Sequence, residues 1–155
     1  GRTMMGMTSQ EMVQMVESLP NPPLGYGANC GTGASDLLRT VLGFAAQGTE
    51  RPIIAKGNAG IPKYVDGHIH YDGTPELMGE YAVMARDCGA TIIGGCCGTM
   101  PEHLNAMRKA LEENERGPRP TLDQITSVLG AFSSTGDGTG DDVKAPARRN
   151  RRRRS

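Results

Sequence analysis

Two adjacent cysteines between glycines place a sharp constraint on how this chain folds. The pair Cys96-Cys97 follows Gly94-Gly95 and an apolar run at 91–93, and Gly98 comes directly after it. Residues 99–102, Thr-Met-Pro-Glu, are typical of a helix start with proline in its first turn. The cysteines therefore lie where a strand ends and a helix begins. In α/β proteins this is the edge of the sheet at which binding sites are built.

The rest of the sequence predicts strands and helices in alternation. A capping box at Thr8 and Glu11 opens a first helix, and three strand-helix units follow it. The predicted strands are 24–29, 52–56 and 90–94; the helices after them start at a Ser35 cap, at Thr74-Pro75 and at Pro101, with a weak helix at 122–129. Such alternation predicts a parallel sheet in an α/β protein. A closed eight-stranded barrel needs about 250 residues, so the pattern fits the C-terminal half of a (β/α)8 TIM barrel. An open doubly wound sheet is the alternative.

Charge divides the chain into two parts. The 17 basic and 17 acidic residues balance, but seven Lys/Arg and only three Asp lie from Ser133 onward. We therefore expect residues 1–130 to form the barrel part and residues 131–155 to form a disordered, Arg-rich tail. The remaining body is mildly acidic, which argues against a core that binds nucleic acid.

The Arg-rich tail offers a second class of function. Arg148, Arg149 and 151–154 form a basic cluster that is able to contact RNA, DNA or an anionic surface. No aromatic residues interleave with the arginines, so stacking on bases is not available. A solvated tail is the favoured interpretation. A non-catalytic, zinc-stabilised domain with a nucleic-acid-binding arm remains the alternative to an enzyme.

Cysteine usage indicates a reducing compartment. There are four cysteines, no secretory signal and no apolar run long enough to span a membrane. We expect a cytoplasmic protein in which clustered thiols bind metal rather than form disulfides. Cys88, within a predicted helix, is interpreted as a small buried hydrophobic residue.

A third cysteine completes a candidate zinc site. Cys30 follows the first predicted strand just as Cys96 and Cys97 follow the third. Catalytic zinc takes three protein ligands and keeps a fourth position open. Neighbouring strand residues point to opposite faces, so the pair shares one metal only where the backbone turns, which its flanking glycines permit. The alternative is two packed core cysteines.

Histidines form a competing metal pair. His68 and His70 lie two residues apart, with Asp66 and Asp72 beside them. The sequence from Gly57 to Gly73 is interpreted as a long, irregular polar loop, so solvation is favoured over metal binding for this pair. His103, near a helix start, is expected at the surface.

Three stretches, in order, resemble the homocysteine S-methyltransferase family. Residues 94–103, Gly-Gly-Cys-Cys-Gly-Thr-Met-Pro-Glu-His, are similar to its signature; Asn29-Cys30 resembles its first zinc ligand, and 57–62 resembles the stretch between the ligands. The likeness covers about 24–111 and is nearest to the betaine-homocysteine type. It implies a zinc-containing (β/α)8 barrel that methylates homocysteine to methionine. It also implies that the first half of the barrel is missing from this chain, which would then be inactive alone.

The resemblance assigns roles to individual residues. It implies that Cys30, Cys96 and Cys97 bind Zn²⁺ at the ends of the sixth and eighth barrel strands. Homocysteine sulfur would take the open position and attack a methyl group. A cationic donor suits this electron-rich site: betaine is expected first, with S-methylmethionine or a methylcorrinoid as alternatives. Asn29 and Asn58 are candidates to hydrogen-bond the ligands or the substrate carboxylate; turn formation is their alternative role. The oligomeric state stays open.

Overall fold

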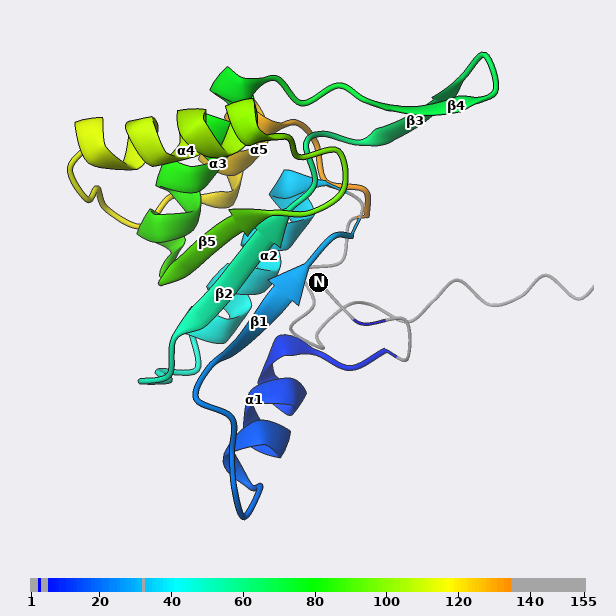
Figure 1. Cartoon of the computed structure of the whole chain (residues 1–155). Helices are drawn as coiled ribbons and strands as arrows, with labels where there is room; N and C mark the ends of the chain where they lie inside the picture. The colour runs from blue at the N-terminus through cyan, green and yellow to red at the C-terminus, as the bar shows by residue number, and fades with distance from the viewer. Residues whose placement is uncertain (1–2, 4–5, 32, 135–155) are drawn as a thin grey trace, which may run out of the picture.

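Three parallel strands form the centre of the molecule. The computed structural model describes residue 3 and residues 6–31 and 33–134. Strands β1 (Tyr26–Asn29), β2 (Ile53–Gly57) and β5 (Ile92–Gly95) pair in the order β1-β2-β5, and both pairings are parallel (Figure 1). The predicted α/β class with a parallel sheet is confirmed. The predicted tail lies mostly at 135–155, outside the described residues.

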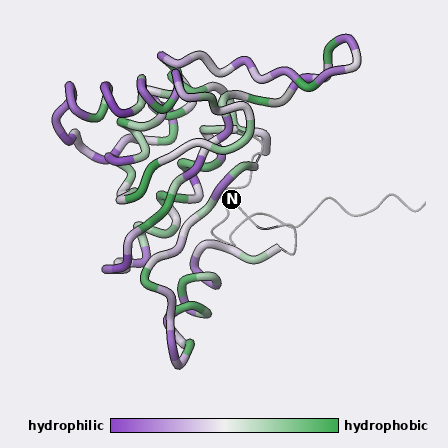
Figure 2. Tube along the Cα trace, viewed as in Figure 1, coloured by the Kyte–Doolittle hydropathy of each residue, from purple (hydrophilic) through white to green (hydrophobic). Residues whose placement is uncertain are grey.

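Helices cover one face of this sheet. Helices α2 (Ala34–Ala45) and α3 (Pro75–Cys88) pack on the strands, and the buried side chains Tyr26, Ile53 and Ala55 face them. Around these two helices lie α1 (Ser9–Glu17) against α2, α4 (Pro101–Glu113) against α3, and α5 (Leu122–Leu129) against both. Figure 2 shows hydrophobic residues along the central strands. The core thus lies between the sheet and the helices.

The opposite face of the sheet is open. Because side chains alternate along a strand, Asn29, Lys56 and Ile92 point away from α2 and α3. Asn29 and Lys56 are exposed, and Ile92 keeps 52% of its surface accessible. One face of this parallel sheet is therefore unburied in the described part of the chain.

A β-hairpin occupies much of the predicted irregular loop, so that interpretation is wrong for 62–71. Strands β3 (Pro62–Val65) and β4 (His68–Tyr71) pair antiparallel and project from the body (Figure 1). The turn between them is Asp66-Gly67, with φ of 50° and 83°. An Asp-Gly pair with two positive φ values is the favoured two-residue hairpin turn. This signal is present in the sequence, between two short runs that mix polar and apolar residues.

Most element ends follow their local signals. Thr8 and Glu11 form the predicted capping box, Thr74 caps α3, and Gly89 ends α3 with a φ of 117°. The predicted weak helix is α5. The prediction that Ser35 caps the helix is wrong: the N-cap of α2 is Gly33, two residues earlier. Ser35 instead donates a hydrogen bond of 2.6 Å from Oγ to the carbonyl of Gly130, which ties α2 to the end of α5.

Candidate metal centre

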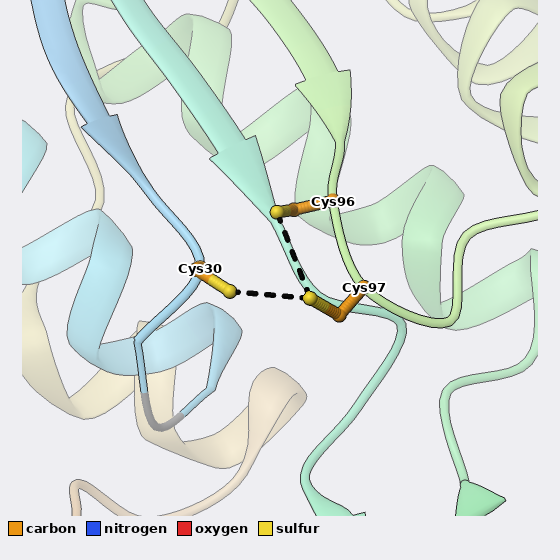
Figure 3. Close-up of side chains that lie close together, drawn as sticks. All are labelled: Cys30, Cys96 and Cys97. Atoms are coloured by element: carbon orange, nitrogen blue, oxygen red, sulfur yellow. Dashed lines mark hydrogen bonds between the residues drawn. The ribbon is translucent and has the colours of Figure 1, made fainter.

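Three thiols meet at the carboxyl end of the sheet. Cys30 directly follows β1, and Cys96 and Cys97 directly follow β5 (Figure 3). The Sγ atom of Cys97 lies 3.3 Å from that of Cys30 and 3.9 Å from that of Cys96. Cys30 and Cys96 are half-buried and Cys97 is exposed. The structure therefore brings the three predicted ligands into one cluster that remains open to solvent.

Backbone turns allow neighbouring cysteines to share this cluster. Gly98 has a φ of 73°, a conformation that L side chains rarely adopt. At Gly95 the constraint is space, because an added Cβ would lie 2.2 Å from the side chain of Thr99. Cys30 itself has a φ of 62°, which costs a non-glycine residue about 1–2 kcal/mol. The backbone conformations around the cysteines, including the unfavourable one at Cys30, thus direct the three thiols toward one point.

The end of β2 holds both cysteine turns in place. Lys56 accepts a hydrogen bond of 2.9 Å from the Cys30 amide, and Gly57 accepts one of 2.7 Å from the Cys96 amide. Ala59 donates its amide to the Cys97 carbonyl at 2.9 Å. The central strand therefore fixes the spacing between turns that are 66 residues apart in the sequence.

Asn58 connects the two turns through its side chain. It is 2% exposed, accepts a hydrogen bond from the Cys97 amide at 3.2 Å and donates one to the Gly31 carbonyl at 3.2 Å. Asn29 is exposed, and its Nδ2 approaches Cys96 Sγ at 3.9 Å. Asn58 is thus placed to hold the cluster together, while Asn29 has only a long contact with it.

The thiols change one another's acidity. Hydrogen bonds from Cys97 first, and then from Cys96, lower the pKa of Cys30 below its usual value. The same Cys30–Cys97 contact raises the pKa of Cys97, which a hydrogen bond from Tyr71 opposes. In contrast, burial raises the pKa of Cys88 to about 12, so that thiol stays protonated. Cys30 is therefore the thiol of the cluster whose surroundings favour the charged form.

The geometry of the cluster fits zinc. A tetrahedral site with Zn–S bonds of 2.3 Å separates its sulfurs by roughly 3.8 Å. The three Sγ atoms lie within 4.8 Å of one another, so small adjustments of the side chains suffice. Among the described residues, no fourth His, Cys, Asp or Glu joins this group. A structural zinc site is closed by four protein ligands, and the described residues supply three of them.

The competing histidine pair has no comparable geometry. His68 and His70 lie on β4 as exposed side chains, and within the described part of the chain they belong to no metal-capable group of three. Asp72 instead pairs with Lys63, which holds the pKa of that carboxyl below its usual range. In the described part of the chain, His68 and His70 therefore do not form a second metal site.

His103 corrects another expectation, because it is buried rather than at the surface. It is 8% exposed; Nδ1 accepts a hydrogen bond of 2.9 Å from the Met100 amide. Nε2 lies 2.9 Å from the Gly73 carbonyl and therefore donates to it. The imidazole joins the start of α4 to the segment that follows the hairpin. The sequence did carry a signal for this contact: His103 lies three residues after Met100, which is the spacing of a capping box.

Comparison with known families agrees with this architecture. The family model of homocysteine S-methyltransferase matches residues 1–111. The chain belongs to the homocysteine S-methyltransferase family. The matched region contains all three clustered cysteines and both asparagines, and it ends within α4. The family is an enzyme class that transfers methyl groups to homocysteine. Among the described helices, none has the length and apolar character needed to cross a membrane.

Proposed function

We propose that this family member transfers a methyl group, with zinc, from a cationic donor to the thiol of homocysteine and so produces methionine. The open cluster of Cys30, Cys96 and Cys97 is the observation that carries the proposal. Three protein sulfurs leave one tetrahedral position for the substrate sulfur.

The residues of the chain would prepare this reaction by position and charge. Zinc, when bound, supplies the positive charge that keeps a coordinating thiol deprotonated near neutral pH. Cys30, Cys96 and Cys97 would hold it as thiolates, and the lowered pKa of Cys30 favours that state. Asn58 would keep the two cysteine turns at a fixed spacing. The exposed side of Cys97 faces solvent and leaves room for substrate.

The charge of the cluster supports a cationic donor. Three thiolates outweigh the two positive charges of Zn²⁺, and the incoming thiolate adds one more negative charge. A donor whose methyl-bearing atom is positive is attracted to such a site. We propose betaine first; S-methylmethionine and a methylcorrinoid are the alternative donors.

We also propose that the sheet is the last part of a (β/α)8 barrel, spanning residues 1–130 and followed by a basic tail at 131–155. Neighbouring strands follow one another in chain order, and α2 and α3 cover the same face. A doubly wound sheet carries helices on both faces. The open face with Lys56 and Ile92 would then be the barrel interior. Free metal-binding thiols favour a reducing compartment, and the cytoplasm is our proposal.

A donor panel with a cysteine variant tests the function. Full-length protein is given homocysteine with betaine, S-methylmethionine or a methylcorrinoid, and methionine is measured. Cys96→Ala should lose zinc and reduce methionine formation to background, because two thiolates no longer define the site. Cys88→Ala removes a cysteine outside the cluster and should keep full zinc content. Full zinc in Cys96→Ala, or no methionine with any donor, would contradict the proposal.

A further inference from the structure

Lys56 places a positive charge on the open face of the sheet, directly before the cysteine turns. Its register partners are Asn29 on β1 and Gly94 on β5, and residues paired in a sheet project from the same face. The Nδ2 atom of Asn29 approaches Cys96 Sγ at 3.9 Å. The backbone carbonyl of Lys56 accepts the Cys30 amide at 2.9 Å. Lys56 therefore belongs to the row of residues that borders the thiol cluster.

The side chain of Lys56 leans toward β5. A Cβ atom added to Gly94 would lie 3.7 Å from Lys56 Cγ, so the lysine stem lies over the space that this glycine leaves open. Strand β5 ends one residue after Gly94 and continues directly into Cys96 and Cys97. The stem thus lies beside the strand that leads to two of the three thiols.

An apolar layer lies on the other side of Lys56. Ile54 and Ile92 pair in register on the same face, two residues before Lys56 and Gly94. An ammonium group among apolar neighbours loses its hydration and gains no partner there. Because the lysine stem is long and flexible, it carries the charge away from this layer, toward the end of the sheet that holds the thiols.

No acidic side chain in the described part of the chain forms an ion pair with Lys56. The other two lysines in that part do have such partners: Lys63 pairs with Asp72, and Lys109 lies 3.8 Å from Glu113. Lys56 is exposed in the 155-residue chain, whereas the proposed barrel would enclose it. An enclosed charge is stable where an opposite charge meets it. The position of Lys56 therefore calls for an anion at the thiol end of the sheet.

We propose that Lys56 binds the carboxylate of a substrate held at the metal centre. The inference rests on the proposed function, because it takes homocysteine and betaine as the molecules that reach the cluster, and each of them carries a carboxylate. A hydrogen bond between an ammonium and a carboxylate is charge-assisted and stronger than a neutral one. With the homocysteine sulfur at the open metal position, a second attachment at Lys56 fixes the orientation of the molecule.

The first test compares two thiols that differ only in the carboxylate. Homocysteine and 3-aminopropane-1-thiol, which lacks the carboxylate, are titrated by calorimetry into zinc-loaded full-length protein without a methyl donor. Lys56→Met should weaken homocysteine binding by about tenfold to a hundredfold, because the carboxylate loses a charged hydrogen bond. Binding of 3-aminopropane-1-thiol should not change. Lys109→Met removes an exposed lysine on α4 and should change neither affinity.

The second test identifies which carboxylate Lys56 binds. The KM for betaine is measured with homocysteine in excess. If the homocysteine carboxylate is the ligand, Lys56→Met weakens homocysteine binding and leaves this KM unchanged. If the betaine carboxylate is the ligand, the KM for betaine rises by about tenfold or more, while homocysteine binding stays as in the wild type. Either result supports a carboxylate site at Lys56.

The outcomes separate this inference from the proposed function. If the zinc-loaded wild-type protein binds no homocysteine, the proposed function and this inference are both wrong. If it binds homocysteine, but Lys56→Met changes neither that affinity nor the KM for betaine, only the role of Lys56 is wrong. Equal losses for both thiols, or weaker zinc binding in chelator competition, would also overturn that role, because Lys56 would then act as a counter-charge to the thiolates.

Discussion

At the scale of single residues, the least exposed polar group of the centre is Asn58. Its amide satisfies the Cys97 N–H and the Gly31 carbonyl, one from each cysteine turn. We predict that Asn58→Ala lowers the free energy of unfolding by about 1–3 kcal/mol, because both backbone groups lose their partner. Zinc affinity should fall by about 10–100-fold as the turns lose their fixed spacing. Denaturant unfolding and chelator competition measure the two effects.

Asn29 provides the matched control for Asn58. It carries the same amide and lies beside the same cluster, but it is exposed, and among the described residues its side chain hydrogen-bonds only to the Sγ of Cys96, at 3.9 Å. Asn29→Ala should change the free energy of unfolding by no more than about 0.5 kcal/mol. If Asn29→Ala and Asn58→Ala behave alike, the connecting role of Asn58 is wrong.

At the scale of elements, the hairpin is the part of the fold that the sequence analysis did not predict. Strands β1, β2 and β5 were predictable because apolar runs, caps and glycines all agreed there. Strand β4 does alternate polar and apolar residues, as His68-Ile69-His70-Tyr71, but the run is only four residues long and both hairpin strands are largely exposed. The Asp66-Gly67 pair beside this short alternating run was the local sign of a hairpin. His103 was misplaced for a related reason: its burial depends on Gly73, which only the fold brings near.

The thiol cluster was predictable in part. Glycines beside Cys96 and Cys97 suggested a turn, and the position of Cys30 suggested a common sheet edge. The sequence did not indicate that β2 would hold both turns through Lys56 and Gly57. Nor did it point to the contact between Tyr71 and Gly98, which joins the base of the hairpin to a residue 27 positions later. Contacts between residues that are far apart in the sequence have no signature in the local sequence.

The Asp66-Gly67 turn makes a prediction for the hairpin. Gly67 has a φ of 83° and no atom within 4 Å of an added Cβ, so backbone conformation alone selects glycine. Gly67→Val should destabilise the hairpin by about 1–2 kcal/mol, because β-branched residues resist left-handed φ. Faster amide hydrogen exchange in β3 and β4 would report this loss.

Gly67→Asn is the control for that prediction, because asparagine tolerates positive φ in such turns. Its exchange rates should remain close to those of the wild type. Similar exchange rates in Gly67→Val and in the wild type would contradict the assigned turn.

At the scale of the whole molecule, the sheet is one-sided. Among the described strands, none pairs with the outer edge of β1 or of β5, and the face with Ile92 is open. An unpaired edge beside exposed apolar surface favours association between chains. The proposed barrel would cover this surface with further strands of the same sheet.

The open face leads to one prediction for the 155-residue chain and to another for the full-length protein. The 155-residue chain alone should self-associate or melt without cooperativity, and Ile92→Lys should reduce that association by placing charge on the open face. In full-length protein Ile92 would line the barrel interior, so the same change should lower the melting temperature by burying an unpaired charge. Ile69→Lys, on the hairpin and 63% exposed, should leave melting unchanged in the full-length protein. Light scattering and thermal melts distinguish these cases. A monomeric chain with a cooperative melt, or an Ile92→Lys full-length protein as stable as the wild type, would mean that this face is not a barrel interior.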